Sequence, residues 1–136
     1  MAERPARISL GKALGARGET SEQMLSLYVP NKDRHDVEIG TQRRWVLQAA
    51  RLLADIGGGV TILPPCEGGW LNEADGRIVW EEPVVVYTYV KSESFLDNLP
   101  RLRELVHRMG RETDQGEVVV DFDGRFYRIV PPYDAA

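Results

Sequence analysis

Apolar and polar residues alternate in a way that predicts the main strands and helices of the chain. The strongest strand signal is Val84–Val90, where every residue is β-branched or aromatic, the types that fit a pleated, half-buried surface. Side chains of a strand alternate between its two faces, so Val85, Tyr87 and Tyr89 point away from the other four. Because both faces are largely apolar, we expect a central strand that is at least partly covered on both sides.

A helical period runs between Thr41, which can cap a helix, and Ile56. Its apolar arc is wide, and Leu47 falls on the polar side as a candidate interface contact. Three glycines, 57–59, follow. A phosphate-binding loop leads from a strand into the N-terminus of a helix, whereas these glycines come after a helix, so we expect them to cap its C-terminal end.

A second amphipathic pattern begins at Ser92 or Ser94 and extends past Met109. Pro100 lies inside it, and proline is tolerated only in the first turn of a helix. We therefore expect a short lead-in followed by a fresh helix that is capped by Asn98. One face of this pattern is apolar and the other is rich in arginine, which is typical of a helix that lies on a sheet.

Shorter apolar runs between turn signals predict the remaining strands. These are Met24–Val29, Val60–Leu63, a small hairpin with arms at Trp70-Leu71 and Ile78–Trp80, and a final hairpin that joins Glu117–Phe122 to Arg125–Val130. The order is β-α-β-hairpin-β-α-β-β, the ferredoxin-like split β-α-β pattern with an extra C-terminal strand. We predict an α+β sandwich: an antiparallel sheet with two helices on one face and a small hairpin insertion at about 66–80.

The length of 136 residues fits one domain. We assign residues 23–132 to it, residues 1–22 to a flexible basic arm, and residues 133–136 to a tail. No apolar run approaches the roughly 20 residues that span a bilayer, so we expect no membrane span. No apolar signal core follows the first arginines, so we also expect no secretory signal. Cys66 is the one cysteine. It can form neither an internal disulfide nor a cysteine-based zinc site, which favours a reducing, cytoplasmic setting.

The net charge of −4 is unevenly distributed along the chain. Residues 1–18 carry four basic side chains against one acidic side chain, which gives +3, so the remainder carries −7. An acidic body argues against bulk binding of nucleic acid. Stacking of bases on the tyrosines is also disfavoured, because the sequence lacks the glycine–aromatic signature of an RNA-recognition sheet.

The aromatic face of the predicted sheet is the main functional lead. If both helices cover one face, Tyr28, Tyr87 and Tyr89 lie on the other. Asp121 is expected beside them. That is more apolar surface than a monomer comfortably exposes. A homodimer formed through this face would cover it, and so would a partner protein or small ligand held under the insertion that carries Trp70.

Carboxylates supply a second lead. Glu67 and Glu82 flank the hairpin insertion, and Asp121 belongs to the final hairpin. If the fold brought these side chains together, they could hold a divalent metal ion with oxygen ligands or carry out acid–base chemistry. The alternative hypothesis is therefore a small metal-dependent phosphodiesterase or nuclease. Solvated surface charge explains the same residues without a site.

A basic stripe lies on the second predicted helix. Arg103, His107 and Arg111 are spaced by four residues, which stacks them along one side of the helix. Such a stripe could meet phosphates or an acidic protein. A solvated helix face explains the same pattern.

The segment from Tyr28 to Val90 resembles a family of small uncharacterised bacterial proteins. The shared features are a glycine-ended helix, the turn Gly68-Gly69-Trp70, and the spacing from Ile78 to Glu81 before a strand rich in valine and tyrosine. The resemblance implies a ferredoxin-like fold. It implies no activity, so it assigns no catalytic residue.

These patterns favour a non-catalytic binding or assembly module over an enzyme. We expect a homodimer that forms through the aromatic sheet face and holds a partner protein or a small ligand, with no cofactor. The candidate ligand or interface residues are Tyr28, Tyr87, Tyr89, Trp70, Glu67 and Glu82.

Overall fold

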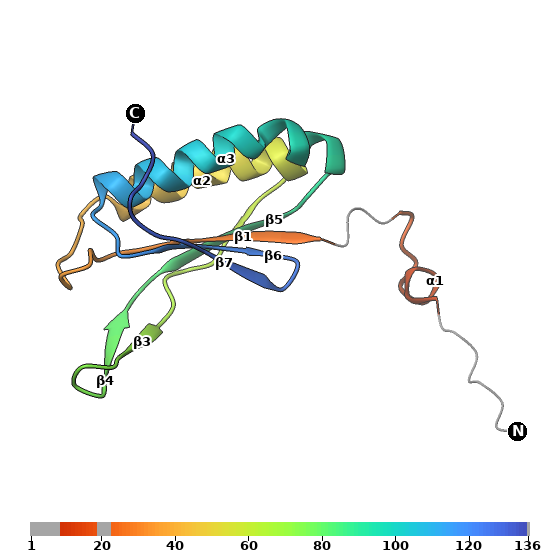
Figure 1. Cartoon of the computed structure of the whole chain (residues 1–136). Coiled ribbons are helices and arrows are strands. Elements are labelled where there is room, and N and C mark those ends of the chain that lie inside the picture. The colour runs from red at the N-terminus through yellow and green to blue at the C-terminus, as the bar shows by residue number, and fades with distance from the viewer. Residues whose placement is uncertain (1–8, 19–22, 136) are drawn as a thin grey trace, which may run out of the picture.

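The computed structural model describes residues 9–18 and 23–135. Its body is a five-stranded antiparallel sheet that carries two long helices on one face (Figure 1). The strand order is β2-β5-β1-β6-β7, and β3 and β4 form a separate two-stranded hairpin. The elements are α1 (Leu10–Leu14), β1 (Met24–Val29), α2 (Gln42–Gly57), β2 (Thr61–Ile62), β3 (Gly68–Asn72), β4 (Arg77–Glu81), β5 (Val84–Tyr89), α3 (Ser92–Glu112), β6 (Val118–Phe122) and β7 (Arg125–Ile129). This is the ferredoxin-like α+β sandwich that the sequence predicts, with β7 as the added edge strand.

Strand β1 lies at the centre of the sheet and sets its two faces. It pairs antiparallel with β5 on one side, where Val29 lies opposite Val84, and with β6 on the other side. Leu25, Leu27 and Val29 are completely buried, because alternate positions of the strand point toward the helices. The intervening positions form the open face of the sheet, away from the helices.

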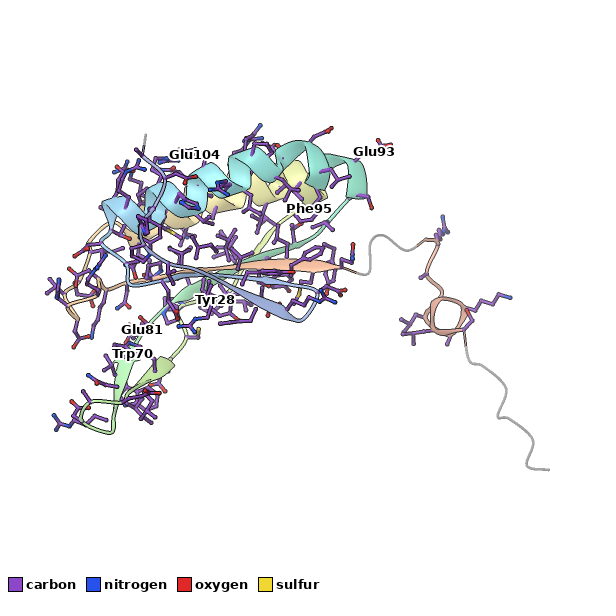
Figure 2. All side chains as sticks on the ribbon, viewed as in Figure 1. Tyr28, Trp70, Glu81, Glu93, Phe95 and Glu104 are labelled. Atoms are coloured by element: carbon purple, nitrogen blue, oxygen red, sulfur yellow. The ribbon has the colours of Figure 1, made fainter. Side chains whose placement is uncertain are left out.

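The helices α2 and α3 each bury an apolar stripe against this sheet. In α2 the stripe includes Trp45, Leu53 and Ile56, which are at most 1% exposed. At the start of α3, Phe95 stacks on Phe122 of β6 with ring centroids 4.8 Å apart (Figure 2). Complete burial of side chains of this size contributes about 1.5–3 kcal/mol each. The contact between the helix layer and the sheet is therefore the main source of stability.

The end of α2 passes close to β5. The glycines end the helix as predicted, since Gly58 has a φ of +86° and its N–H donates to the carbonyl of Ala54. Gly57 has a different role. A Cβ built on Gly57 would overlap Oγ1 of Thr88 and lie 2.5 Å from the carbonyl oxygen of Tyr89. The helix can approach the strand this closely only because no side chain intervenes.

Helix α3 runs without a break from Ser92 to Glu112, so the predicted restart at Asn98 is wrong. Pro100 lies inside the helix, where it offers no N–H to the carbonyl of Leu96. Leu96 is 66% exposed, so water can reach that turn of the helix and satisfy the carbonyl. Asn98 serves the same helix differently, because its side-chain amide donates to the carbonyl of Ser94.

The start of α2 also differs from the prediction. Thr41 is the residue before the helix, but its side chain makes no capping hydrogen bond, and its backbone lacks the extended conformation of a capping residue. The side chain of Gln42 instead donates to the carbonyls of Val29 and Glu82. These two hydrogen bonds join the start of α2 to the end of β1 and to the chain just beyond β4.

The hairpin of β3 and β4 projects from the body on the side of the sheet that the helices leave open (Figure 1). Its pairing runs from Gly68 opposite Glu81 to Asn72 opposite Arg77. We call it the hairpin arm. Four of its apolar side chains are about half exposed: Trp70, Leu71, Ile78 and Trp80. A two-stranded hairpin by itself is marginally stable in water, so this apolar arm is a candidate for contact with another molecule.

Before β1, the described residues 9–18 include the short helix α1. Its first turn begins at Ser9, whose Oγ accepts the N–H of Lys12, and the helix buries no side chain. The rest of the predicted flexible arm, at 1–8 and 19–22, lies outside the described residues. In the described part of the chain, each helix is too short or too polar to cross a membrane.

Replacing Gly57 by alanine is expected to lower the free energy of unfolding by about 1–3 kcal/mol. The added Cβ would collide with a backbone carbonyl that is fixed in the sheet, which outweighs the roughly 1 kcal/mol that alanine gains in helix propensity. Gly59→Ala is the matched control, because a Cβ at Gly59 meets nothing within 4 Å. Urea denaturation of both variants measures the difference, and equal stabilities would contradict the close approach.

Candidate functional site

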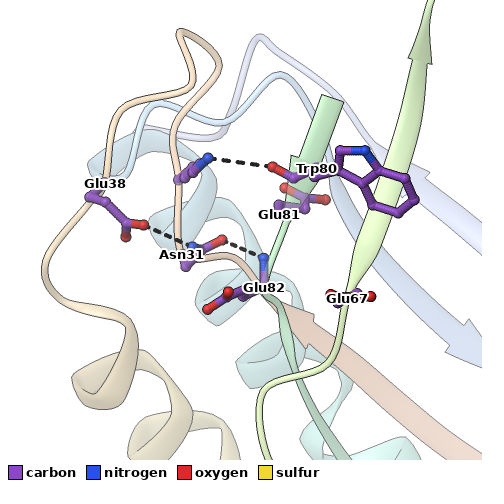
Figure 3. Close-up of a pocket in the computed structure, with 7 residues that line it drawn as sticks. Asn31, Glu38, Glu67, Trp80, Glu81 and Glu82 are labelled. Carbon is purple, nitrogen blue, oxygen red and sulfur yellow. Dashed lines mark hydrogen bonds between the residues drawn. The ribbon is translucent and has the colours of Figure 1, made fainter. Parts of the chain in front are cut away.

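A pocket of about 440 Å³ lies where the end of β1 meets the base of the hairpin arm (Figure 3). One wall is the loop between β1 and α2, and the chain on either side of the arm forms the other. The lining residues are Asn31, Lys32, Glu38, Glu67, Trp80, Glu81 and Glu82. The two walls are far apart in the sequence, and they meet because β1 is paired with β5.

Asn31 connects the two walls of the pocket. It is only 7% exposed. Its Nδ2 donates to Oε1 of Glu38 at 3.0 Å, and its Oδ1 accepts the N–H of Glu82 at 2.9 Å (Figure 3). Lys32 adds a longer contact from Nζ to the carbonyl of Trp80, at 3.4 Å. Because both ends of the buried amide are satisfied, Asn31 fixes the positions of the groups around it.

The lining of the pocket is strongly acidic. Four glutamates against one lysine give the ionised lining a formal charge of −3. Partial burial raises the pKa of the Glu81 carboxyl above its usual range, and the charge of nearby Lys32 offsets part of that shift. Several carboxylates around one pocket create a negative field there, which favours the binding of a cation.

The structure brings two of the predicted carboxylates together and leaves the third apart. Glu67 and Glu82 both line the pocket. Asp121 lies on β6 opposite Ser26, toward the end of β1 that is remote from Asn31. Within the described residues, no group of three or more histidine, cysteine or acidic side chains is arranged to hold a metal ion. The phosphodiesterase hypothesis stays a prediction that this geometry does not strengthen.

The open face of the sheet carries the tyrosines that the alternation predicts. Tyr28 and Tyr87 are half-buried, and Tyr89 is 49% exposed. Tyr87 and Tyr89 meet edge to face, with ring centroids 6.3 Å apart. Phe126 of β7, which is 58% exposed, extends the group through an edge contact with Tyr28. We call these four residues the aromatic face. Trp70 lies on the hairpin arm, outside the lining of the pocket.

The basic stripe on α3 is occupied by the end of the chain itself. Arg103 makes a two-point contact with the carboxylate of Asp134, at 2.7 and 3.1 Å, and this contact holds the pKa of Asp134 below its usual range. Nδ1 of His107 accepts the N–H of Asp134 at 2.8 Å, and Arg111 donates to its carbonyl. Tyr133 packs against the same helix. The predicted stripe therefore has a partner within the chain.

Three lining residues on the β1 side of the pocket are absent from the predicted site. Asn31 and Lys32 have the sequence character of a turn, and Glu38 belongs to no predicted element. The signal that could have found them is the topology. A ferredoxin-like fold pairs the first strand antiparallel with the strand at Val84, so the residues after Val29 and before Val84 must meet at one edge of the sheet.

No protein-family model matches this chain, and no curated protein sequence matches it either. Among solved structures, a phage SAM lyase in complex with S-methyl-5'-thioadenosine has a TM-score of 0.55 at 16% identity, covering 88% of this chain and 97% of that one. A phage SAM lyase in the apo state has a TM-score of 0.53 at 17% identity, covering 83% of this chain and 92% of that one. At this level of identity, the likeness establishes the small α+β fold.

Replacing Glu81 by glutamine is expected to stabilise the protein at neutral pH. Burial raises the pKa of Glu81, so its ionisation costs stability as the pH rises from the unfolded pKa, about 4.3, through the raised folded value, and the full cost persists above it. The gain from Glu81→Gln should therefore be largest near about pH 7 and vanish below about pH 4. Thermal unfolding across this range measures it.

Glu82→Gln is the matched control, because Glu82 is an exposed glutamate of the same lining. Glu82→Gln removes the same negative charge, but the carboxylate that it removes is exposed to solvent. A gain from Glu81→Gln that is independent of pH, or that equals the effect of Glu82→Gln, would contradict the assignment.

Proposed function

We propose that the protein binds a small cationic ligand in the pocket at the base of the hairpin arm. The ligand that fits best is an adenosine derivative of the S-adenosylmethionine (SAM) type. The observation that carries the proposal is the acidic lining, in which four glutamates and one lysine surround about 440 Å³. Pockets of this size are typical of small-molecule sites.

The chemistry of the lining matches a sulfonium ion. The sulfur of SAM carries a permanent positive charge, and carboxylates face the pocket from both walls, with Glu38 on one and Glu67 and Glu82 on the other (Figure 3). Trp80 is 59% exposed and offers an aromatic surface beside them. An aromatic ring attracts a cation and also stacks on a planar base such as adenine. Charge and aromatic surface together favour a cationic nucleoside over a neutral or anionic ligand.

Two solved structures with this fold support the same ligand class. Both neighbours are phage SAM lyases, and one of them holds S-methyl-5'-thioadenosine. Identities of 16% and 17% do not transfer a function. The shared fold is nevertheless a second observation in favour of the proposal, and it is independent of the charge of the pocket.

We propose in addition that the chain forms a homodimer through the aromatic face. Tyr89 and Phe126 are about half exposed there, and the hairpin arm projects on the same side of the sheet (Figures 1 and 2). A second copy placed against this side would cover the aromatic face and the arm together, which removes apolar surface from water. Contact with the second copy would also fix the position of the hairpin arm, which supplies Trp80 and Glu81 to one wall of the pocket.

Catalysis on the same ligand is the second candidate function. The observation that favours it is that both structural neighbours are lyases, and carboxylates such as those of the pocket can act as general acids or bases. Incubation with SAM followed by chromatography separates the two functions. SAM that is recovered to the same extent as from a protein-free sample indicates a binding module, whereas more S-methyl-5'-thioadenosine than in that sample indicates an enzyme.

Titration calorimetry with SAM is expected to give a dissociation constant on the order of 10 µM. S-adenosylhomocysteine has a neutral sulfur and should bind about tenfold more weakly or worse, because the carboxylates then lose the sulfonium charge. Trp80→Ala should weaken SAM binding by about tenfold. Trp70→Ala is the matched control, since Trp70 lies on the same arm outside the lining. Equal affinities for the two ligands, or equal effects of the two tryptophan variants, would exclude the proposed site.

Light scattering is expected to give twice the mass of the chain for the wild-type protein. The double variant Tyr87→Glu/Tyr89→Glu should be a folded monomer by circular dichroism, because burying unpaired carboxylates at an interface is unfavourable. Leu96→Glu is the control, since Leu96 is 66% exposed on α3, across the sheet from the aromatic face. A monomeric wild type, or a dimer that survives the tyrosine substitutions, would refute this interface. Either result would have no bearing on the ligand that is proposed for the pocket.

A further inference from the structure

A groove of about 390 Å³ lies between α2 and α3. Glu104, one of its lining residues, points away from the sheet (Figure 2), so the groove opens on the outer surface of the helix layer. Leu52 and Leu105, each 4% exposed, form its floor, and Leu47 stands beside them with 52% of its surface exposed. Leu47 is the apolar residue that the helical pattern places on the polar side of its helix. The groove therefore has an apolar base within a charged surface.

Three arginines surround this base: Arg51 of α2, and Arg101 and Arg108 of α3. Nη1 and Nη2 of Arg101 both donate to Oδ2 of Asp55 at 3.1 Å, and Nε of Arg51 lies 3.4 Å from the other carboxylate oxygen. One carboxylate thus serves two guanidinium groups. Each guanidinium has five N–H donors, so this end of the groove keeps donors with no acceptor among the described residues.

The third arginine is held by stacking as well as by charge. Nε of Arg108 donates to Oε1 of Glu104 at 2.7 Å, and its guanidinium lies 5.1 Å from the ring centroid of Trp45. Arg44 contacts the same ring at 5.3 Å. An arginine that is already oriented loses less side-chain freedom when it binds a carboxylate. The rim of the groove is therefore an ordered cationic surface in a chain whose net charge is −4.

We infer that this groove docks an acidic amphipathic helix of a partner protein. The apolar stripe of such a helix would lie on the three leucines, as in other helix-in-groove complexes. Glutamates or aspartates beside the stripe would make two-point contacts with the arginines of the rim. Charge complementarity favours this occupant, because the four arginines at the rim outnumber the three carboxylates that pair with them: Asp55, Glu104 and Glu112.

A nucleic acid fits the groove less well than an acidic helix. It offers no apolar stripe for Leu47, and its phosphates would meet Glu104 and a body of negative net charge. The basic stripe of Arg103, His107 and Arg111 does not extend the cationic surface, because Asp134 already occupies it. The inference is independent of the ligand proposed for the acidic pocket.

The test uses a fluorescein-labelled synthetic peptide of about 16 residues, with leucines at helical spacing and glutamates elsewhere. Fluorescence anisotropy at low salt should show that it binds the full-length protein, and that a scrambled peptide and a lysine-for-glutamate peptide do not. Arg51→Glu/Arg101→Glu should weaken binding by about tenfold or more. The matched control is Arg77→Glu/Arg125→Glu, which makes the same charge change on exposed arginines outside the helix layer.

A second variant tests the same groove in case Arg51→Glu/Arg101→Glu does not fold. Leu47→Ser removes an exposed apolar contact and keeps every charge of the rim, and it should also weaken binding by about tenfold. Equal binding of the scrambled peptide, or binding that none of the groove variants changes, would overturn the inference. So would a DNA duplex of about 20 base pairs that binds more tightly than the peptide and in a way that depends on Arg51 and Arg101, which would assign the groove to nucleic acid.

Discussion

The antiparallel pairing of β1 with β5 is the contact on which the rest of the structure depends. It places Val29 opposite Val84, so the residues after one strand and before the other emerge at the same edge of the sheet. At that edge Asn31 accepts the N–H of Glu82, and Gln42 donates to the carbonyls of Val29 and Glu82. A slip of one residue in this register would turn the buried face outward and separate the two walls of the pocket. The fold and the candidate site therefore rest on the same ladder of hydrogen bonds.

Much of the fold can be predicted from the sequence, because the alternation of apolar residues and the chemistry of turns are local properties of the chain. The strand at Val84, the glycine end of α2 and the turn at Asp123-Gly124, whose two residues both have positive φ, lie where the pattern puts them. The prediction fails at Pro100, which lies within a continuous helix. Whether a proline breaks a helix depends on whether the carbonyl that it leaves unpaired can reach water. That depends on the tertiary packing of the helix, which a local pattern does not encode.

The site is harder to predict than the fold for a related reason. Glu82 stands out in the sequence because it flanks an insertion, but Asn31 resembles an ordinary turn residue until its strand is paired. The basic stripe around Arg103 shows the converse. Its spacing is regular, yet Asp134 fills it from the far end of the chain. A charge pattern along one helix shows where an acidic group can bind, and it does not show whether the chain supplies that group itself.

The two candidate surfaces carry opposite charge, and the core orients both. On the helix side, Trp45 is 1% exposed, and the guanidiniums of Arg44 and Arg108 stack against its ring, so a core residue orients part of the cationic surface. On the other side, the β1–β5 ladder brings together the two walls that carry the carboxylates of the pocket. Among these is Glu81 of β4, whose burial opposes its own ionisation. A fold selected for stability alone would remove such a carboxylate, and a site that needs a negative field retains it. Different core contacts therefore anchor the two surfaces.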